Sequence, residues 1–221
     1  MKLNLLFPNL IFILFYFFPF SSGLIAQDSK IIFSSTEIVW YGLDFTKTKF
    51  VGGGFGYGYG YDLKIKFIPN WNALTLNEPQ NFDLKRAFRK NKVIIDIRSV
   101  NKINSKIDPD ECISYNEANI TKDSVTAMVK LYKDFEKKEG VGLSFVVVNF
   151  NKSMQRAEIY VAFFDIATKN ILLCEKMGGK AGGAGLRNYW AGAIKAILVQ
   201  IDEAEYKNWK KESKFFQVLL T

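Results

Sequence analysis

The chain has 221 residues, a formal net charge of +8 and enough hydrophobic residues (48%) for a substantial core. It contains no histidine, which excludes Ser-His-Asp and Cys-His catalysis, the common zinc sites and a near-neutral histidine switch. The positive charge favours anionic partners such as lipid headgroups, envelope polymers or acidic proteins, and no nucleic-acid-binding motif accompanies it.

Residues 1–26 are typical of a secretory signal peptide: Lys2 precedes an apolar run over residues 5–20, and small residues follow. A retained membrane anchor is the alternative. However, Pro8 and Pro19 bracket only about ten uninterrupted apolar residues, against the roughly 20 that a spanning helix needs. No cysteine lies near the cleavage region. The sequence therefore predicts an exported protein, periplasmic or secreted, with no lipid anchor and no transmembrane span after cleavage.

Residues 27–221 are expected to form one α/β domain. Residues 37–45 predict a buried strand, because they are rich in β-branched and aromatic side chains, and the strand continues over 47–51 after a kink. A loop rich in glycine and tyrosine follows at 52–61. It lacks the fingerprint of a phosphate-binding loop, so it is either an aromatic contact loop or a plain connection. The candidate contact residues in it are Tyr57, Tyr59 and Tyr61.

The middle of the chain alternates between regular and irregular segments. Residues 69–79 are expected to be irregular, a helix is expected to begin at Asn81, and residues 93–97 predict a strand. Residues 101–119 are long, polar and predicted to be a surface insertion. Thr121 is then positioned to cap an amphipathic helix that ends at the glycines near 140.

Three strands follow, at 141–149, 157–165 and 171–174, and short turns between them predict an antiparallel meander. A glycine-rich loop at 178–185 leads into a last helix that opens near Asn188, and the apolar segment 215–220 can dock onto the domain or a partner. This order of elements predicts an α+β two-layer sandwich. In it, a mixed sheet ends in an antiparallel meander and about three helices pack on one face.

The segment AEIYVAFFDIATKNILLCEKMGGKAGGAG, with Asp165, Thr168 and Lys169 in its first turn, resembles a group of bacterial envelope domains. These are the TolB N-terminal domain, the periplasmic part of the curli secretion channel and the activators of penicillin-binding proteins. VWYGLDF, NEPQNFDL and GAGLRNYWAGAI resemble exported, uncharacterised proteins of Gram-negative bacteria. The first resemblance implies a protein that docks onto other envelope components rather than a catalyst.

The segment at 178–190 is a candidate anion site. A glycine loop that enters a helix N-terminus presents unpaired N–H groups to an anion. Lys180 and Arg187 could add charge, and Asn188 and Tyr189 could orient a ligand. The alternative is a tight loop in which Tyr189 and the next residue anchor the helix in the core.

Three carboxylates, Asp44, Glu78 and Asp165, would suit acid–base work on glycans if two of them shared a cleft. Strand-end aspartates usually cap turns instead. Cys112 and Cys174 form either a disulfide, which in the chain-entropy model stabilises by about 4 kcal/mol, or two buried free thiols.

The leading interpretation is an exported, non-enzymatic envelope accessory or interaction module, with an envelope protein or an anionic envelope component as partner. It needs no cofactor and no metal. The alternatives are a small exported hydrolase that acts on envelope polymers through carboxylates, and a binder of an anion or small ligand at 178–190.

Overall fold

The computed structural model describes residues 29–218. The predicted signal peptide and the last residues of the apolar segment 215–220 lie outside the described residues. Between residues 29 and 218, none of the helices combines the length and the apolar character that a membrane crossing requires.

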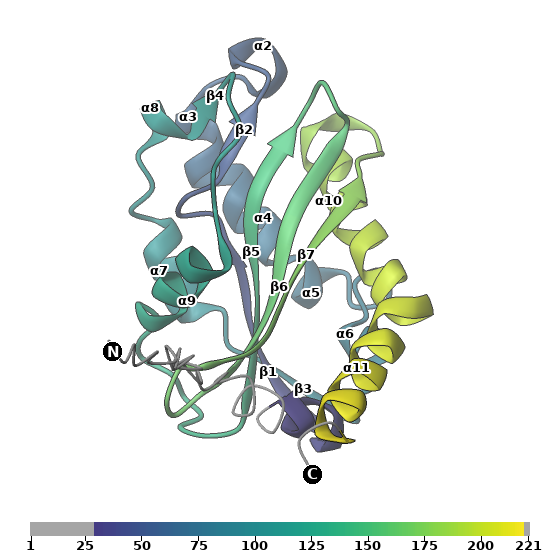
Figure 1. The fold of residues 1–221 in the computed structure, drawn as a ribbon. Helices are drawn as coiled ribbons and strands as arrows, with labels where there is room; N and C mark the ends of the chain where they lie inside the picture. Colours follow the sequence, from purple (N-terminus) through teal and green to yellow (C-terminus); the bar gives the residue numbers. More distant parts are fainter. Residues whose placement is uncertain (1–28, 219–221) are drawn as a thin grey trace, which may run out of the picture.

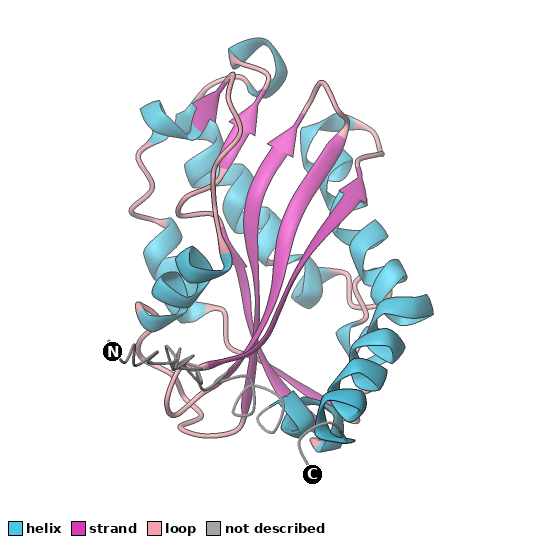
Figure 2. Cartoon of the chain, in the orientation of Figure 1, coloured by secondary structure: helices cyan, strands magenta, loops and turns pink. Residues whose placement is uncertain are grey.

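A seven-stranded mixed sheet forms the centre of the molecule (Figures 1 and 2). Its strands are β1 (Glu37–Asp44), β2 (Lys49–Val51), β3 (Lys92–Ile95), β4 (Ile113–Ser114), β5 (Val141–Asn151), β6 (Arg156–Asp165) and β7 (Ile171–Lys180). The meander β5-β6-β7 is antiparallel, as predicted. On its other edge β5 pairs in parallel with β1 along its first half and with β2 along its second half. β3 lies outside β1 and β4 lies outside β2, both in parallel.

The helices are α2 (Gly54–Tyr57), α3 (Gly60–Asp62), α4 (Ile68–Asn72), α5 (Leu74–Asn77), α6 (Leu84–Ala87), α7 (Arg98–Asn104), α8 (Pro109–Cys112), α9 (Lys122–Lys130), α10 (Gly185–Gln200) and α11 (Tyr206–Val218). Two π-helical segments extend them: η1 (Leu63–Phe67) joins α3 to α4, and η2 (Ile201–Glu205) joins α10 to α11. Residues 29–34 are also helical.

Helices cover both faces of the sheet, so the predicted two-layer sandwich with helices on one face is wrong. On one face, Phe145, Val161 and Phe163 belong to a buried cluster that includes residues of α4, α6, α10 and α11. On the other face, Val146 and Phe164 belong to a second cluster with residues of α7 and α9. The central strands are apolar on both sides because both sides are packed.

The helix capped by Thr121 is confirmed: the Thr121 side chain accepts a hydrogen bond from the Ser124 N–H. It ends at Lys130, however, well before the glycines near 140. The helix expected from Asn81 is the single turn α6, which begins after Asp83. The segment expected to be irregular, 69–79, is largely helical in α4 and α5.

The polar segment 101–119 is not a simple surface insertion, because it contains the end of α7, the turn α8 and the edge strand β4. The predicted glycine loop 178–185 is shorter than expected. Gly178 and Gly179 belong to β7. A Cβ on Gly179 would lie 2.0 Å from the Ala193 carbonyl oxygen of α10, so glycine permits this close approach of helix and strand.

Candidate functional site

Four segments that are distant in sequence meet at one end of the molecule, the end that carries α2 in Figure 1. The Gly52 N–H donates to the Ser114 carbonyl (3.0 Å), and the Lys152 N–H donates to the Val51 carbonyl (2.9 Å). The Ala181 N–H donates to the Gln155 carbonyl (2.8 Å). These bonds connect the glycine/tyrosine segment, β4, the β5–β6 turn and the loop before α10. Both glycine-containing candidate segments therefore belong to one region.

Tyr57 is a core residue, so its prediction as a contact residue is wrong. Its ring is 2% exposed and stacks on Trp190, with ring centres 5.9 Å apart. Its hydroxyl donates to the Phe150 carbonyl, and burial raises its pKa. The predicted loop over 52–61 is also not what the structure shows, because α2 and α3 form helical turns over most of the segment.

Tyr59 and Tyr61 are directed to solvent, with exposed fractions of 79% and 61%. Tyr115, which the sequence analysis missed, is 84% exposed and lies just after β4. The sequence did contain a signal for Tyr115, because it is a single aromatic residue in the polar segment 101–119. We call Tyr59, Tyr61 and Tyr115 the tyrosine surface.

The backbone below the tyrosine surface is closely packed. A Cβ on Gly60 would lie 1.8 Å from the Pro109 carbonyl oxygen, so α3 lies directly against α8. A Cβ on Gly53 would lie 2.7 Å from the Tyr115 hydroxyl, so the Tyr115 ring covers the Gly53 backbone. Glycine is needed at position 60 because two backbones approach closely, and at position 53 because φ is +68°. The exposed rings therefore stand on a fixed scaffold.

Lys152 joins the glycine/tyrosine segment to the start of α10. Its ammonium nitrogen lies 4.7 Å from the centre of the Tyr189 ring, a cation–π geometry. Tyr189 packs edge-on against Trp190 and is half-buried, so it partly anchors the helix, as the alternative interpretation expected. The Tyr189 carbonyl accepts a bond from the Gly182 N–H (3.0 Å).

Arg187 is already paired within the fold. It forms an ion pair with Glu78 and donates to the Asn188 side-chain oxygen (2.9 Å). Its carbonyl accepts a bond from the Trp71 indole (2.9 Å). The two charged groups are about one-third exposed. Lys180 and Asn188 are exposed, at the end of β7 and in the first turn of α10. The guanidinium thus faces a carboxylate of the same chain, which competes with any anion.

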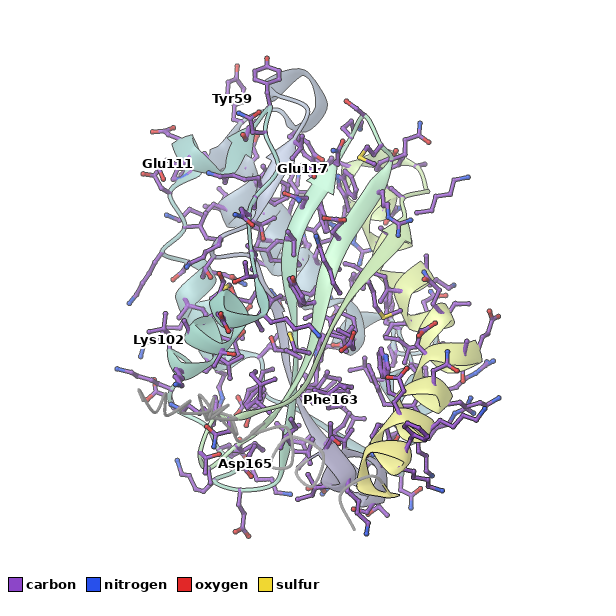
Figure 3. The ribbon with its side chains drawn as sticks, in the orientation of Figure 1. Tyr59, Lys102, Glu111, Glu117, Phe163 and Asp165 are labelled. Atoms are coloured by element: carbon purple, nitrogen blue, oxygen red, sulfur yellow. The ribbon has the colours of Figure 1, made fainter. Side chains whose placement is uncertain are left out.

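The three candidate carboxylates have three separate environments. Asp44 is fully buried and accepts bonds from Thr46 and Tyr132, and Glu78 pairs with Arg187. Asp165 accepts bonds of 2.8 Å from both the N–H and the hydroxyl of Thr168, and it lies at the opposite end of the molecule from Tyr59 (Figure 3). The structure therefore does not bring them together as an acid–base pair.

The two cysteines are free, buried thiols in different hydrophobic clusters, Cys112 in one and Cys174 in the other. Burial raises the pKa of both, to about 12 for Cys174. Across residues 29–218, no group of three or more Cys, Asp or Glu side chains is arranged to hold a metal ion.

No protein-family model, curated protein or solved structure matches the chain. The resemblances to envelope domains and to exported proteins therefore stay predictions.

Proposed function

We propose that this chain is an exported, non-enzymatic interaction module of the cell envelope and that the tyrosine surface is its contact face for a protein partner. The observation that carries the proposal is the exposure of three large aromatic rings on one closely packed scaffold. Tyrosine presents an apolar ring and a polar tip at little conformational cost, and it is enriched at protein interfaces.

The charges around the tyrosine surface favour a protein over a uniform polyanion. Glu111 and Glu117 lie at the same end of the molecule as Tyr59 (Figure 3). Lys152 contributes a positive charge in the adjoining β5–β6 turn, where Met154 is also exposed. Mixed charge around an aromatic centre is the usual anatomy of an interface between proteins.

The two alternative functions have less support. A carboxylate hydrolase needs two acids in one cleft, and the three candidates occupy separate environments. An anion binder at 178–190 needs a free Arg187, and Arg187 is paired with Glu78.

The test is site-specific photocrosslinking in the native envelope. A benzoylphenylalanine in place of Tyr59 should capture one defined protein, whereas the same probe in place of Leu131, which is 61% exposed elsewhere, should not. The Tyr59→Ser/Tyr61→Ser/Tyr115→Ser variant should lose the partner in a pull-down.

The matched control variant is Leu76→Ser/Leu131→Ser/Val199→Ser, which removes three exposed apolar side chains outside the tyrosine surface. It should keep the partner. Equal capture from both probe positions, or equal loss in both triple variants, would refute the proposal.

A further inference from the structure

The exposed side of α11 carries an unneutralised row of lysines. Lys207, Lys210, Lys211 and Lys214 are spaced at i, i+3, i+4 and i+7, which places them on one face of the helix. All four are exposed, and none forms an ion pair with another described residue. Tyr206 and Trp209 are buried on the other side and fix the helix to the body. We call the four residues the lysine row.

A second basic cluster lies against the same helix. Arg86 and Arg89 of the α6 region both contact Asp202, at 2.6 and 3.0 Å, so one carboxylate faces two guanidinium groups. Lys90, next to Arg89, donates a 3.2 Å hydrogen bond to the Tyr206 hydroxyl at the start of α11. Two clusters that are far apart in the sequence thus form one basic face.

An exposed aromatic side chain accompanies this face. Phe215 is 64% exposed and lies one turn beyond Lys211, at the end of the lysine row. The Ser29 hydroxyl lies 3.1 Å from that of Ser213, so the first described residue rests against α11.

We propose that the basic face formed by the lysine row, Arg86 and Arg89 binds the anionic phospholipid surface of a membrane. Lysines and arginines near an anionic leaflet each strengthen binding by about fivefold, and an exposed aromatic ring at the rim can enter the headgroup region. The helix at 29–34 and the end of α11 lie near the opposite end of the molecule from Tyr59, so the basic face and the tyrosine surface are separate (Figures 1 and 3).

The test is vesicle co-sedimentation of the full chain. The probes are phosphatidylcholine vesicles with and without about 30% phosphatidylglycerol, at about 0.1 M and about 0.5 M salt. The lysine-row variant replaces Lys207, Lys210, Lys211 and Lys214 by Gln. Its matched control, which changes the net charge equally, replaces the exposed Lys47, Lys66, Lys106 and Lys130 by Gln.

We expect the lysine-row variant to lose at least about tenfold in affinity for the anionic vesicles at low salt, with a change under about threefold in the control. Binding to neutral vesicles reports any apolar contribution of residues 1–28 and should be equal in all three proteins. Both circular dichroism and the unfolding midpoint should confirm that the variants are folded.

Three results would overturn the proposal: equal wild-type binding to neutral and anionic vesicles, equal losses in the two variants, or binding that salt does not weaken. Soluble polyphosphate is the last probe in this binding experiment. Tight polyphosphate binding that depends on the lysine row, without vesicle binding, would assign the face to a soluble polyanion instead.

Discussion

The Tyr132 hydroxyl donates a 2.9 Å hydrogen bond to Oδ2 of Asp44, and neither side chain has any exposed surface. Ser144 lies 3.2 Å from the same hydroxyl, and both the N–H and the hydroxyl of Thr46 donate to the other carboxylate oxygen. Burial raises the pKa of Asp44, although these bonds act in the opposite direction. The Asp44 carboxyl group therefore stabilises the junction after β1, and it is not exposed to solvent.

Replacing Asp44 by Asn should flatten the pH dependence of stability. Because the Asp44 pKa is raised in the folded protein, the unfolded chain releases this proton first, at a pH of about 4, and stability falls as pH rises further. An amide has no proton to release. Urea unfolding from pH 4 to pH 7 should therefore show a steeper fall for the wild type than for Asp44→Asn. Identical slopes would contradict the assignment of a raised pKa.

Asp44→Ala is the complementary variant. It leaves the Tyr132 and Thr46 donors without their buried partner, so we expect a loss of about 2–4 kcal/mol at neutral pH. The exposed Asp110→Ala variant should change stability by less than about 0.5 kcal/mol. If Asp44→Ala loses no more stability than the Asp110→Ala control, water reaches the Asp44 site.

Asn72 takes the place of a neighbouring strand where β3 no longer borders β1. Its side-chain oxygen accepts from the Leu43 N–H (2.7 Å) and its amide donates to the Leu43 carbonyl (2.9 Å). Asn72→Leu leaves the buried Leu43 N–H unpaired, whereas the Leu43 carbonyl keeps its 2.8 Å bond from the Asn104 amide, and we expect the free energy of unfolding to fall by about 1–3 kcal/mol. Asn81→Leu, at an exposed position, is the control. Equal midpoints in urea for the two variants would disprove the role given to Asn72.

Elements that depend on contacts between near neighbours in the sequence were predicted, and elements that depend on distant contacts were not. The meander and the Thr121 cap depend on contacts between near neighbours, and both were predicted. The bonds that Asn72 and Asn104 make to Leu43, near the end of β1, span 29 and 61 positions, so no local pattern indicates them. The strands of the meander are apolar on both faces, which is typical of a sheet covered on both sides, but this pattern does not indicate which segments form the second layer.

The glycine/tyrosine segment is a second place where the sequence pattern did not predict the structure. Alternating Gly and Tyr suggested equivalent rings, but Tyr57 ends the helical turn α2 and is buried, whereas Tyr59 lies between α2 and α3 and is exposed. The spacing of two residues has opposite meanings in a strand and in a helical turn. Tyr115 joins the surface only because β4 pairs with β2, a contact between segments far apart in the sequence.

Gly179→Ala should test how closely α10 approaches β7. The added methyl group would lie 2.0 Å from the Ala193 carbonyl oxygen, so helix and strand must separate, and we expect a loss of about 3 kcal/mol. Gly182→Ala is the matched control, because no atom lies within 4 Å of its Cβ position. Calorimetry on both variants gives the comparison. A control as unstable as Gly179→Ala would show that the effect is not steric.

Lys90 should give stability an unusual rise at alkaline pH. Its side chain is 5% exposed and donates to the carbonyls of Ile32 and Ser35, which ties the helix at 29–34 to the body. Burial lowers its pKa to about 8. Above this pH the folded protein has released the proton, while the unfolded chain, with a pKa near 10.5, still holds it. The unfolded state then binds more protons, so the free energy of unfolding rises with pH, by up to about 1.4 kcal/mol per pH unit.

This window is narrow because buried thiols and tyrosines act in the opposite direction. Burial raises the pKa of Cys112 and Cys174, so the unfolded chain releases their protons first, from a pH of about 8.5. Burial raises the pKa of Tyr206 to about 12, so the unfolded chain loses that proton first and stability falls. Urea unfolding at several pH values between about 8 and 9.5 should show a more positive slope of stability against pH in the wild type and in the exposed control Lys85→Met than in Lys90→Met. If Lys90→Met keeps the same slope as the wild type, Lys90 is protonated in the folded protein. In that case the helix at 29–34 is held to the body by a charged ammonium group throughout the window.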